Sequence, residues 1–252
     1  MCLTAFSWKQ HPDYQLILLA NRDEFYNRST EVAHIWKGEN QIVAGKDVQA
    51  GGTWMGINKH GKFAAITNYR DLSTIKPEAP SRGKLTLEFL EGDIAAREYI
   101  HQLTPEAGNY NGFNLLIGDR HELWYLSNVS GELRALQPGL YGLSNHLLDT
   151  PWPKVVKAKN ILSEFDHLSE SQLLQAFGNR ELAPDNDLPD TGVGQALERK
   201  LSAMFIHFEK YGTRCTTLLT IDYRGRVRFR ERTFYQGAKK GDDALYNFTI
   251  LS

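Results

Sequence analysis

The fold is decided at the start of the chain, where residues 2–24 read CLTAFSWKQHPDYQLILLANRDE. Two apolar, strand-like stretches flank segment 9–13, which is polar, contains proline and has the composition of a turn. The pattern predicts an antiparallel β-hairpin. With the turn centred near residue 12, paired positions sum to about 24, so we expect Cys2 to lie opposite Arg22, give or take about two residues.

Outside this hairpin, runs of strands are separated by inserted helices. Strands are expected at residues 2–8, 14–21, 42–44, 53–58, 62–68, 113–119, 122–127, 132–136, 140–144, 216–222 and 227–234. Helices are expected from about residue 81 to 90, at 94–103 after a cap at Asp93, at 151–165, up to 177 after a cap at Ser169, and at 195–205. This order is not the strict βαβ alternation of a parallel sheet, so an α+β domain of layered antiparallel sheets is favoured. No repeat or linker divides the chain, which predicts one domain over residues 1–252.

The composition is that of a globular protein, with 41% hydrophobic and 23% charged residues in 252. A net charge of −1 gives no general attraction to nucleic acid or to anionic membranes. No stretch approaches the roughly 18 consecutive apolar residues of a membrane span, and no signal-peptide core follows Met1. Two cysteines and eight scattered histidines give neither a disulfide framework nor a zinc-binding pattern. We therefore expect a cytoplasmic protein without membrane insertion or nucleic-acid partner.

Cys2 is the candidate for chemistry. Methionine aminopeptidase generally removes Met1 before a small residue, which would make Cys2 the first residue of the mature chain. Its α-amino group would then have a pKa near 7.7–8.0 and could act as a base toward its own thiol. A nearby guanidinium such as that of Arg22 would favour the thiolate. A cysteine at position 2 says little on its own, so the rest of the chain has to support the assignment.

Six short motifs occur in one order along the chain. They are Met1-Cys2-Leu3, Ala20-Asn21-Arg22-Asp23-Glu24, Ala50-Gly51-Gly52-Thr53-Trp54-Met55-Gly56, Thr67-Asn68-Tyr69-Arg70, Ser81-Arg82-Gly83 and Gly212-Thr213-Arg214. Together they resemble the NRDE family, also called the Transport and Golgi organization protein 2 family. The resemblance runs from Met1 to about Phe234, nearly the whole chain.

The resemblance implies the fold of the N-terminal nucleophile hydrolases, a four-layer αββα sandwich of antiparallel sheets. It also implies chemistry similar to that of choloylglycine hydrolase and penicillin V acylase, in which an N-terminal cysteine attacks the amide of a small-molecule substrate without a metal or organic cofactor. By this resemblance, Cys2 matches the nucleophile, and Arg22 with Asp23 matches the supporting pair on the second strand. Asn68 and Asn145 match the two oxyanion asparagines, and Arg214 matches a later supporting arginine.

One departure concerns the pair on the second strand. The acylases separate this arginine and aspartate by two residues, whereas Arg22 and Asp23 are adjacent and would point to opposite faces of a regular strand. Glu24 shares a face with Arg22 and is a rival for the carboxylate role. The two asparagines could instead cap turns, and Arg214 could be a buried ion-pair partner.

Two other functions stay open at this point. A protein of this fold could bind a haem- or acyl-lipid-related molecule without turnover, with Cys2 as a contact residue, because thiolates bind haem iron and the family is linked in general terms to haem homeostasis and lipid metabolism. It could also act in trafficking without a small-molecule site. The sequence indicates neither a substrate nor an oligomeric state.

Overall fold

The computed structural model describes residues 2–251, and of Cys2 it describes the backbone alone. Within that range the strands form two antiparallel sheets, ordered β10-β1-β2-β11-β12-β13 and β3-β4-β5-β6-β7-β8-β9. The first sheet is built from β1 (Cys2–Trp8), β2 (Tyr14–Phe25), β10 (Gly139–Leu143), β11 (Tyr211–Asp222), β12 (Arg226–Tyr235) and β13 (Lys239–Thr249). The second is built from β3 (Thr30–Ile35), β4 (Val43–Asp47), β5 (Met55–Ile57), β6 (Phe63–Asn68), β7 (Phe113–Gly118), β8 (Leu123–Ser127) and β9 (Leu133–Ala135).

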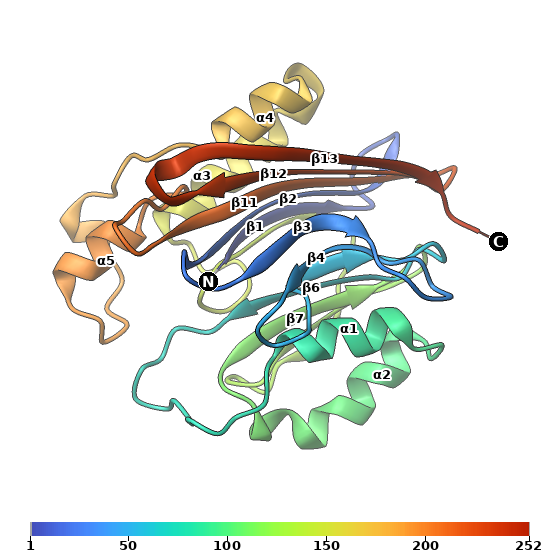
Figure 1. Cartoon of the computed structure of the whole chain (residues 1–252), viewed down its shortest axis with the longest axis horizontal. Helices are drawn as coiled ribbons and strands as arrows, with labels where there is room; N and C mark the ends of the chain where they lie inside the picture. The colour runs from blue at the N-terminus through green and yellow to red at the C-terminus, as the bar shows by residue number, and fades with distance from the viewer. Residues whose placement is uncertain (1, 252) are drawn as a thin grey trace.

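Helices cover the outer face of each sheet (Figure 1). The α-helices are α1 (Gly83–Glu91), α2 (Ala96–Leu103), α3 (Pro153–Ser163), α4 (Glu170–Ala176) and α5 (Gln195–Leu201). Short 3₁₀ turns lie at η1 (Thr104–Asn109), η2 (Phe165–His167), η3 (Asp185–Asp187) and η4 (Gln236–Ala238). Among residues 2–251, no helix has both the length and the apolar character that crossing a membrane would require.

Three apolar cores hold these layers together. Alternate residues of β2 serve two of them: Leu16 and Leu18 pack between the sheets, whereas Ile17 and Leu19 pack outward against α3 and α4. The third core joins α1 and α2 to the outer face of the second sheet, with Phe89 as one of its buried side chains. The result is the αββα sandwich that was predicted, with α1 and α2 on one side and α3 and α4 on the other (Figure 1).

The N-terminal hairpin has the predicted register. Strand β1 pairs with β2 so that Cys2 lies opposite Arg22 and Trp8 opposite Leu16. The cap predicted at Ser169 is also present: its side chain accepts from the Gln172 amide, as part of a capping box.

Several boundaries differ from the prediction. The helix expected after Asp93 begins only at Ala96 without a side-chain cap, so the cap assignment was wrong. Helix α5 ends at Leu201, and the segment after it turns and bends instead of continuing the helix. The amide of Phe205 donates to the Asn179 carbonyl, and the Ile206 carbonyl accepts from the Thr213 amide. A buried apolar run of irregular backbone has the same composition as the end of a buried helix, which explains the error.

Two strands were not predicted at all, β3 and β13. Both lie at the edge of a sheet and pair on one side only. Most of their side chains are partly or fully exposed, so their sequences lack the apolar content that marked the inner strands. Edge strands are commonly polar, because an apolar edge would invite pairing with another chain.

Candidate functional site

The end of β2 presents Arg22 and Asp23 on opposite faces. The strand stays regular as far as Phe25, and the bulge in this pair of strands lies in β11 at Arg214, where the register shifts between Thr213 and Cys215. The Arg22 guanidinium lies 4.0 Å from the centroid of the Trp54 ring, on the side of the second sheet. Adjacent positions of the motif therefore face different surroundings, as expected for an unbulged strand.

Asp23 is a buried carboxyl group, 1% exposed. Its Oδ1 accepts a 2.6 Å hydrogen bond from the Thr213 hydroxyl. Burial raises the pKa of Asp23, while the positive charges of Lys154 and Arg70 and the Thr213 hydroxyl act in the opposite direction. Lys154 is itself buried and donates to the Leu201 carbonyl at the end of α5. Asp23 thus supports a network of buried charges behind the end of β2.

Glu24, the rival carboxylate, is partly exposed, whereas Asp23 is buried. Its Oε1 accepts from the Phe25 amide, and its Oε2 lies 3.9 Å from Arg28. Arg28 in turn makes a bidentate contact with Asp47 at 3.0 and 2.7 Å. Asp23 and Glu24 are therefore available for different roles: the first is enclosed among cations, and the second faces solvent-accessible space.

Asn68 and Asn145 meet although 77 residues separate them. The Asn145 Nδ2 donates to the Asn68 carbonyl at 2.9 Å. The Arg70 amide donates to the Asn145 carbonyl at 2.8 Å, and the Arg70 guanidinium lies 3.4 Å from the Asn145 Oδ1. Because both oxygens of Asn145 face Arg70, the fully buried amide has a fixed orientation, and its Nδ2 carries a second N–H beyond the one given to Asn68.

Arg70 also joins this pair of asparagines to α5. Its Nη1 donates to Glu198 Oε2 at 2.7 Å, and both side chains are almost completely buried. The other carboxylate oxygen of Glu198 accepts the Thr191 amide at 2.8 Å and the Thr191 hydroxyl. Burial lowers the pKa of Arg70, and the negative charge of Glu198 opposes that effect.

Arg214 lies apart from the asparagines. Its Nη1 donates to the carbonyls of Phe25 and Arg28 at 2.9 and 3.1 Å, so it holds the turn between β2 and β3. It lines a small cavity of about 50 Å³ together with Arg22 and Cys215. Neither of the two large cavities described next has Arg214 among the described residues of its lining.

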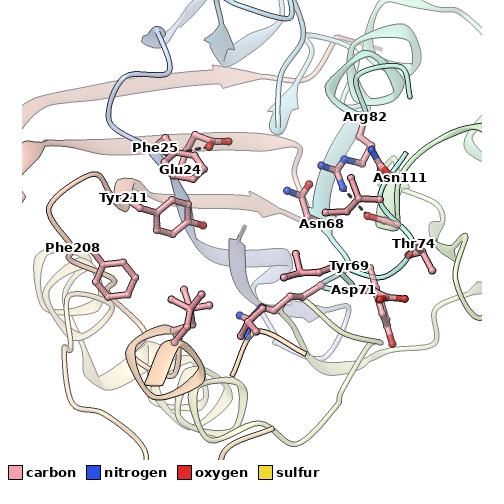
Figure 2. A pocket seen from close by; sticks show the side chains of 17 residues that line it. Glu24, Phe25, Asn68, Tyr69, Asp71, Thr74, Arg82, Asn111, Phe208 and Tyr211 are labelled. Carbon is pink, nitrogen blue, oxygen red and sulfur yellow. Dashed lines mark hydrogen bonds between the residues drawn. The ribbon is translucent and has the colours of Figure 1, made fainter. Parts of the chain in front are cut away.

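Two adjoining cavities open beside the end of β2. One, of about 570 Å³, has a mainly apolar lining that includes Leu201, Phe208 and Tyr211 (Figure 2). The other, of about 450 Å³, is mainly polar and is lined by Arg22 and Asp47 among others. The residues common to both linings are Glu24, Asn68, Arg82 and Asn111. Their volumes lie in the usual range for small-molecule sites.

The position of Cys2 relative to the cavities is known from its backbone. The strand register puts it across from Arg22, which lines the polar cavity. The side chain of Cys2 lies outside the described part of the chain, so its role as nucleophile stays a prediction. Among the described residues, no group of three or more His, Cys, Asp or Glu side chains is arranged to hold a metal ion.

Sequence reasoning missed two residues of the site. Arg70 belongs to the motif that supplied Asn68, and its place two residues after a candidate oxyanion residue was a usable signal. Glu198 gave none, because a glutamate in a short amphipathic helix is ordinarily exposed. Only the three-dimensional structure shows that the two pair.

Comparison with known proteins agrees with this architecture. A family model described as Transport and Golgi organisation 2 matches residues 1–236. The chain belongs to the Transport and Golgi organisation 2 family. Within this family, the homolog from Mus musculus is 35% identical and the one from Homo sapiens 34%, each alignment covering 100% of both chains. The Drosophila melanogaster protein is 28% identical over 92% of each chain.

Among solved structures, this member of the Transport and Golgi organisation 2 family is similar to the C2A mutant of conjugated bile acid hydrolase from Clostridium perfringens. The TM-score is 0.52 at 9% identity, covering 99% of this chain and 92% of the other. At that identity the likeness shows the fold, which is that of the N-terminal nucleophile hydrolases.

Proposed function

We propose that this protein is a cytoplasmic cysteine amidohydrolase that cleaves the C–N bond of a small-molecule amide, with Cys2 as its N-terminal nucleophile. The observation that carries the proposal is the pairing of residue 2 with Arg22 at the wall of the polar cavity that Asn68 also lines. The similar fold of a conjugated bile acid hydrolase, whose name records replacement of a cysteine at position 2, supports the same reading.

The proposed reaction needs only groups of this chain and water. After removal of Met1, the α-amine of Cys2 takes the thiol proton and Sγ attacks the amide carbonyl carbon, forming a tetrahedral oxyanion. The C–N bond then breaks as the protonated α-amine gives its proton to the leaving nitrogen, which leaves a thioester. Water, deprotonated by the same amine, attacks the thioester and releases the carboxylic acid and the thiol.

Two features of the site suit these steps. A guanidinium favours a nearby thiolate over the thiol, and Arg22 stands opposite residue 2 in the hairpin. The second Nδ2–H of Asn145 and the side chain of Asn68 are candidate donors to the oxyanion, and the bonds of Asn145 to Arg70 and Asn68 hold its amide in place. Fixed donors of this kind are worth about 3–4 kcal/mol each in acyl transfer.

The test is hydrolysis of simple chromogenic amides, for which acetyl, hexanoyl and phenylacetyl p-nitroanilides serve as probes. We expect turnover by the natively processed protein and a loss of at least about 100-fold in the Cys2→Ala variant. Cys215→Ala is the matched control, because Cys215 is a buried thiol on β11 and should leave the rate within about twofold. Equal rates in the wild-type and Cys2→Ala proteins would contradict the proposal, and binding without any turnover would favour the non-catalytic binding protein.

A further inference from the structure

The larger cavity gathers apolar side chains that the fold leaves exposed. Phe25 is 54% exposed, Leu72 53%, Ile75 56% and Leu197 39%, and all four line this one cavity. They come from the end of β2, from the loop between β6 and α1, and from α5. Contiguous exposed apolar surface is costly in water and marks a site that a ligand or partner covers. The concave shape and the volume of about 570 Å³ favour a small molecule.

The neighbouring cavity has the opposite character. Guanidinium, carboxylate and hydroxyl groups surround it, among them Arg22, Arg28, Asp47 and Ser81. Both arginines and carboxylates line this cavity, so it can bind a small polar group through guanidinium donors such as that of Arg22 or through carboxylate acceptors such as that of Glu24. Asn68 is one of the residues that line both cavities, so one molecule can occupy both with its middle at that residue.

We propose that the ligand is an amphiphilic amide. Its apolar group lies in the cavity walled by α5 and the loop after β6, its small polar group lies in the adjoining polar cavity, and its amide lies at Asn68. This inference rests on the proposed function only for the position of the amide. The distribution of apolar and polar side chains carries the rest, and the ligand class would stand for a non-catalytic protein as well.

Helix α5 forms the part of the apolar cavity that the ligand's apolar group is expected to contact. Leu197 and Leu201 face the cavity from this helix, and Glu198 between them is anchored to Arg70. The anchor makes α5 a fixed wall, since its buried carboxylate is held by Arg70 and by Thr191. A charge placed at Leu197 should therefore weaken binding of an apolar ligand group. The variant should still fold, because this side chain is partly exposed.

The experiment is calorimetric titration of the Cys2→Ala protein with N-acetylglycine, N-hexanoylglycine and N-decanoylglycine, which differ only in apolar length. Burial of a methylene strengthens binding about threefold to fourfold, so we expect the decanoyl probe to bind at least about 30-fold more tightly than the hexanoyl probe. N-methyldecanamide, which keeps the chain but lacks the polar group, should bind more weakly than N-decanoylglycine.

Variants locate the binding. Leu197→Asp in α5 and Ile75→Asp in the loop between β6 and α1 should each weaken N-decanoylglycine binding about tenfold or more. The control is Leu245→Asp, a residue of β13 that is 47% exposed and lies outside both linings, and it should bind like the parent. Affinity independent of chain length, no binding of any probe, or equal loss in Leu245→Asp would overturn the inference.

The two proposals fail differently. Because binding is measured without the nucleophile, tight binding of N-decanoylglycine combined with no hydrolysis of any amide would remove the proposed function and leave the ligand class intact. Hydrolysis of short amides combined with no gain from longer chains would do the reverse.

Discussion

Arg70 and Glu198 stand 128 residues apart in the sequence and form a 2.7 Å ion pair whose side chains are 4% and 2% exposed. Arg70 follows the end of β6 and holds Asn145, while Glu198 lies in α5. One contact therefore positions both the candidate oxyanion asparagines and the wall of the apolar cavity.

Removing one partner of this pair should be costly. Glu198→Ala would leave the Arg70 charge buried without its carboxylate, which typically lowers the free energy of unfolding by about 3–5 kcal/mol. Urea unfolding measures the change. Asp185→Ala is the matched control, because it breaks an exposed ion pair with Arg199, a neighbour of Glu198 in α5. It should lower the free energy of unfolding by less than about 1 kcal/mol. Equal losses in the two variants would show that the Arg70 pair is not special.

Asn145→Asp tests the oxyanion assignment with little change in shape. The variant keeps an oxygen for Arg70 but replaces the Nδ2 donor with an acceptor. We expect kcat for amide hydrolysis to fall about 100- to 1,000-fold, while alkylation of Cys2 by iodoacetamide stays within about threefold of the wild-type rate. A parallel fall in both rates would instead mean that Asn145 supports the folded site as a whole.

Asp243 should stabilise the edge strand β13. Its carboxylate accepts from Arg232 at 2.9 and 3.0 Å, and these bonds lower the pKa of Asp243 to about 2. The stabilisation is complete above the ordinary pKa of the unfolded chain and is lost as pH falls from about 4 toward about 2. Asp243→Asn should therefore lower the free energy of unfolding by about 0.5–1 kcal/mol at neutral pH.

For this strand, urea unfolding between about pH 7 and about pH 3 should show the difference between wild type and variant narrowing toward low pH. The neighbouring Asp242→Asn is the control. A pH-independent difference would mean that the carboxylate charge is not responsible.

His146 should make stability fall in mild acid. Its ring centroid lies 5.0 Å from that of Tyr69 and 5.6 Å from that of Trp152, with the rings tilted. Its Nδ1 contacts the Thr150 hydroxyl, and burial lowers its pKa. The unfolded chain then binds a proton near pH 6.5 that the folded chain does not, so stability declines as pH drops below about 6.5. In His146→Gln the slope of unfolding free energy between about pH 7 and about pH 5 should be smaller, whereas His60→Gln, at an exposed site, should keep the wild-type slope.

The parts of the fold that follow from local pattern were predictable. The hairpin register could be predicted by counting residues around one turn, and the structure has that register. The cap could be predicted from the serine that precedes a helical stretch, and in the structure the Ser169 side chain accepts from the Gln172 amide. Strands β3 and β13 were not predicted, because edge strands bury few side chains and their sequences therefore contain few apolar residues.

The site was predictable only as far as the motifs reached. They supplied Arg22 and Asn68, and the family resemblance supplied Asn145, whose side chain is hydrogen-bonded to the Asn68 carbonyl in the structure. The partnership of Arg70 with Glu198 joins residues that lie 128 apart in the sequence, and the two cavities are lined by several segments that are distant in the sequence. No local spacing encodes either feature.

The central claim is that Cys2 becomes an N-terminal nucleophile. The most direct measurement is mass spectrometry of natively expressed protein, first intact and then after brief treatment with iodoacetamide at neutral pH and peptide mapping. The account predicts a chain lacking Met1 and one rapid alkylation, on Cys2, with the buried Cys215 reacting far more slowly. A chain that fully retains Met1, or preferential labelling of Cys215, would contradict it.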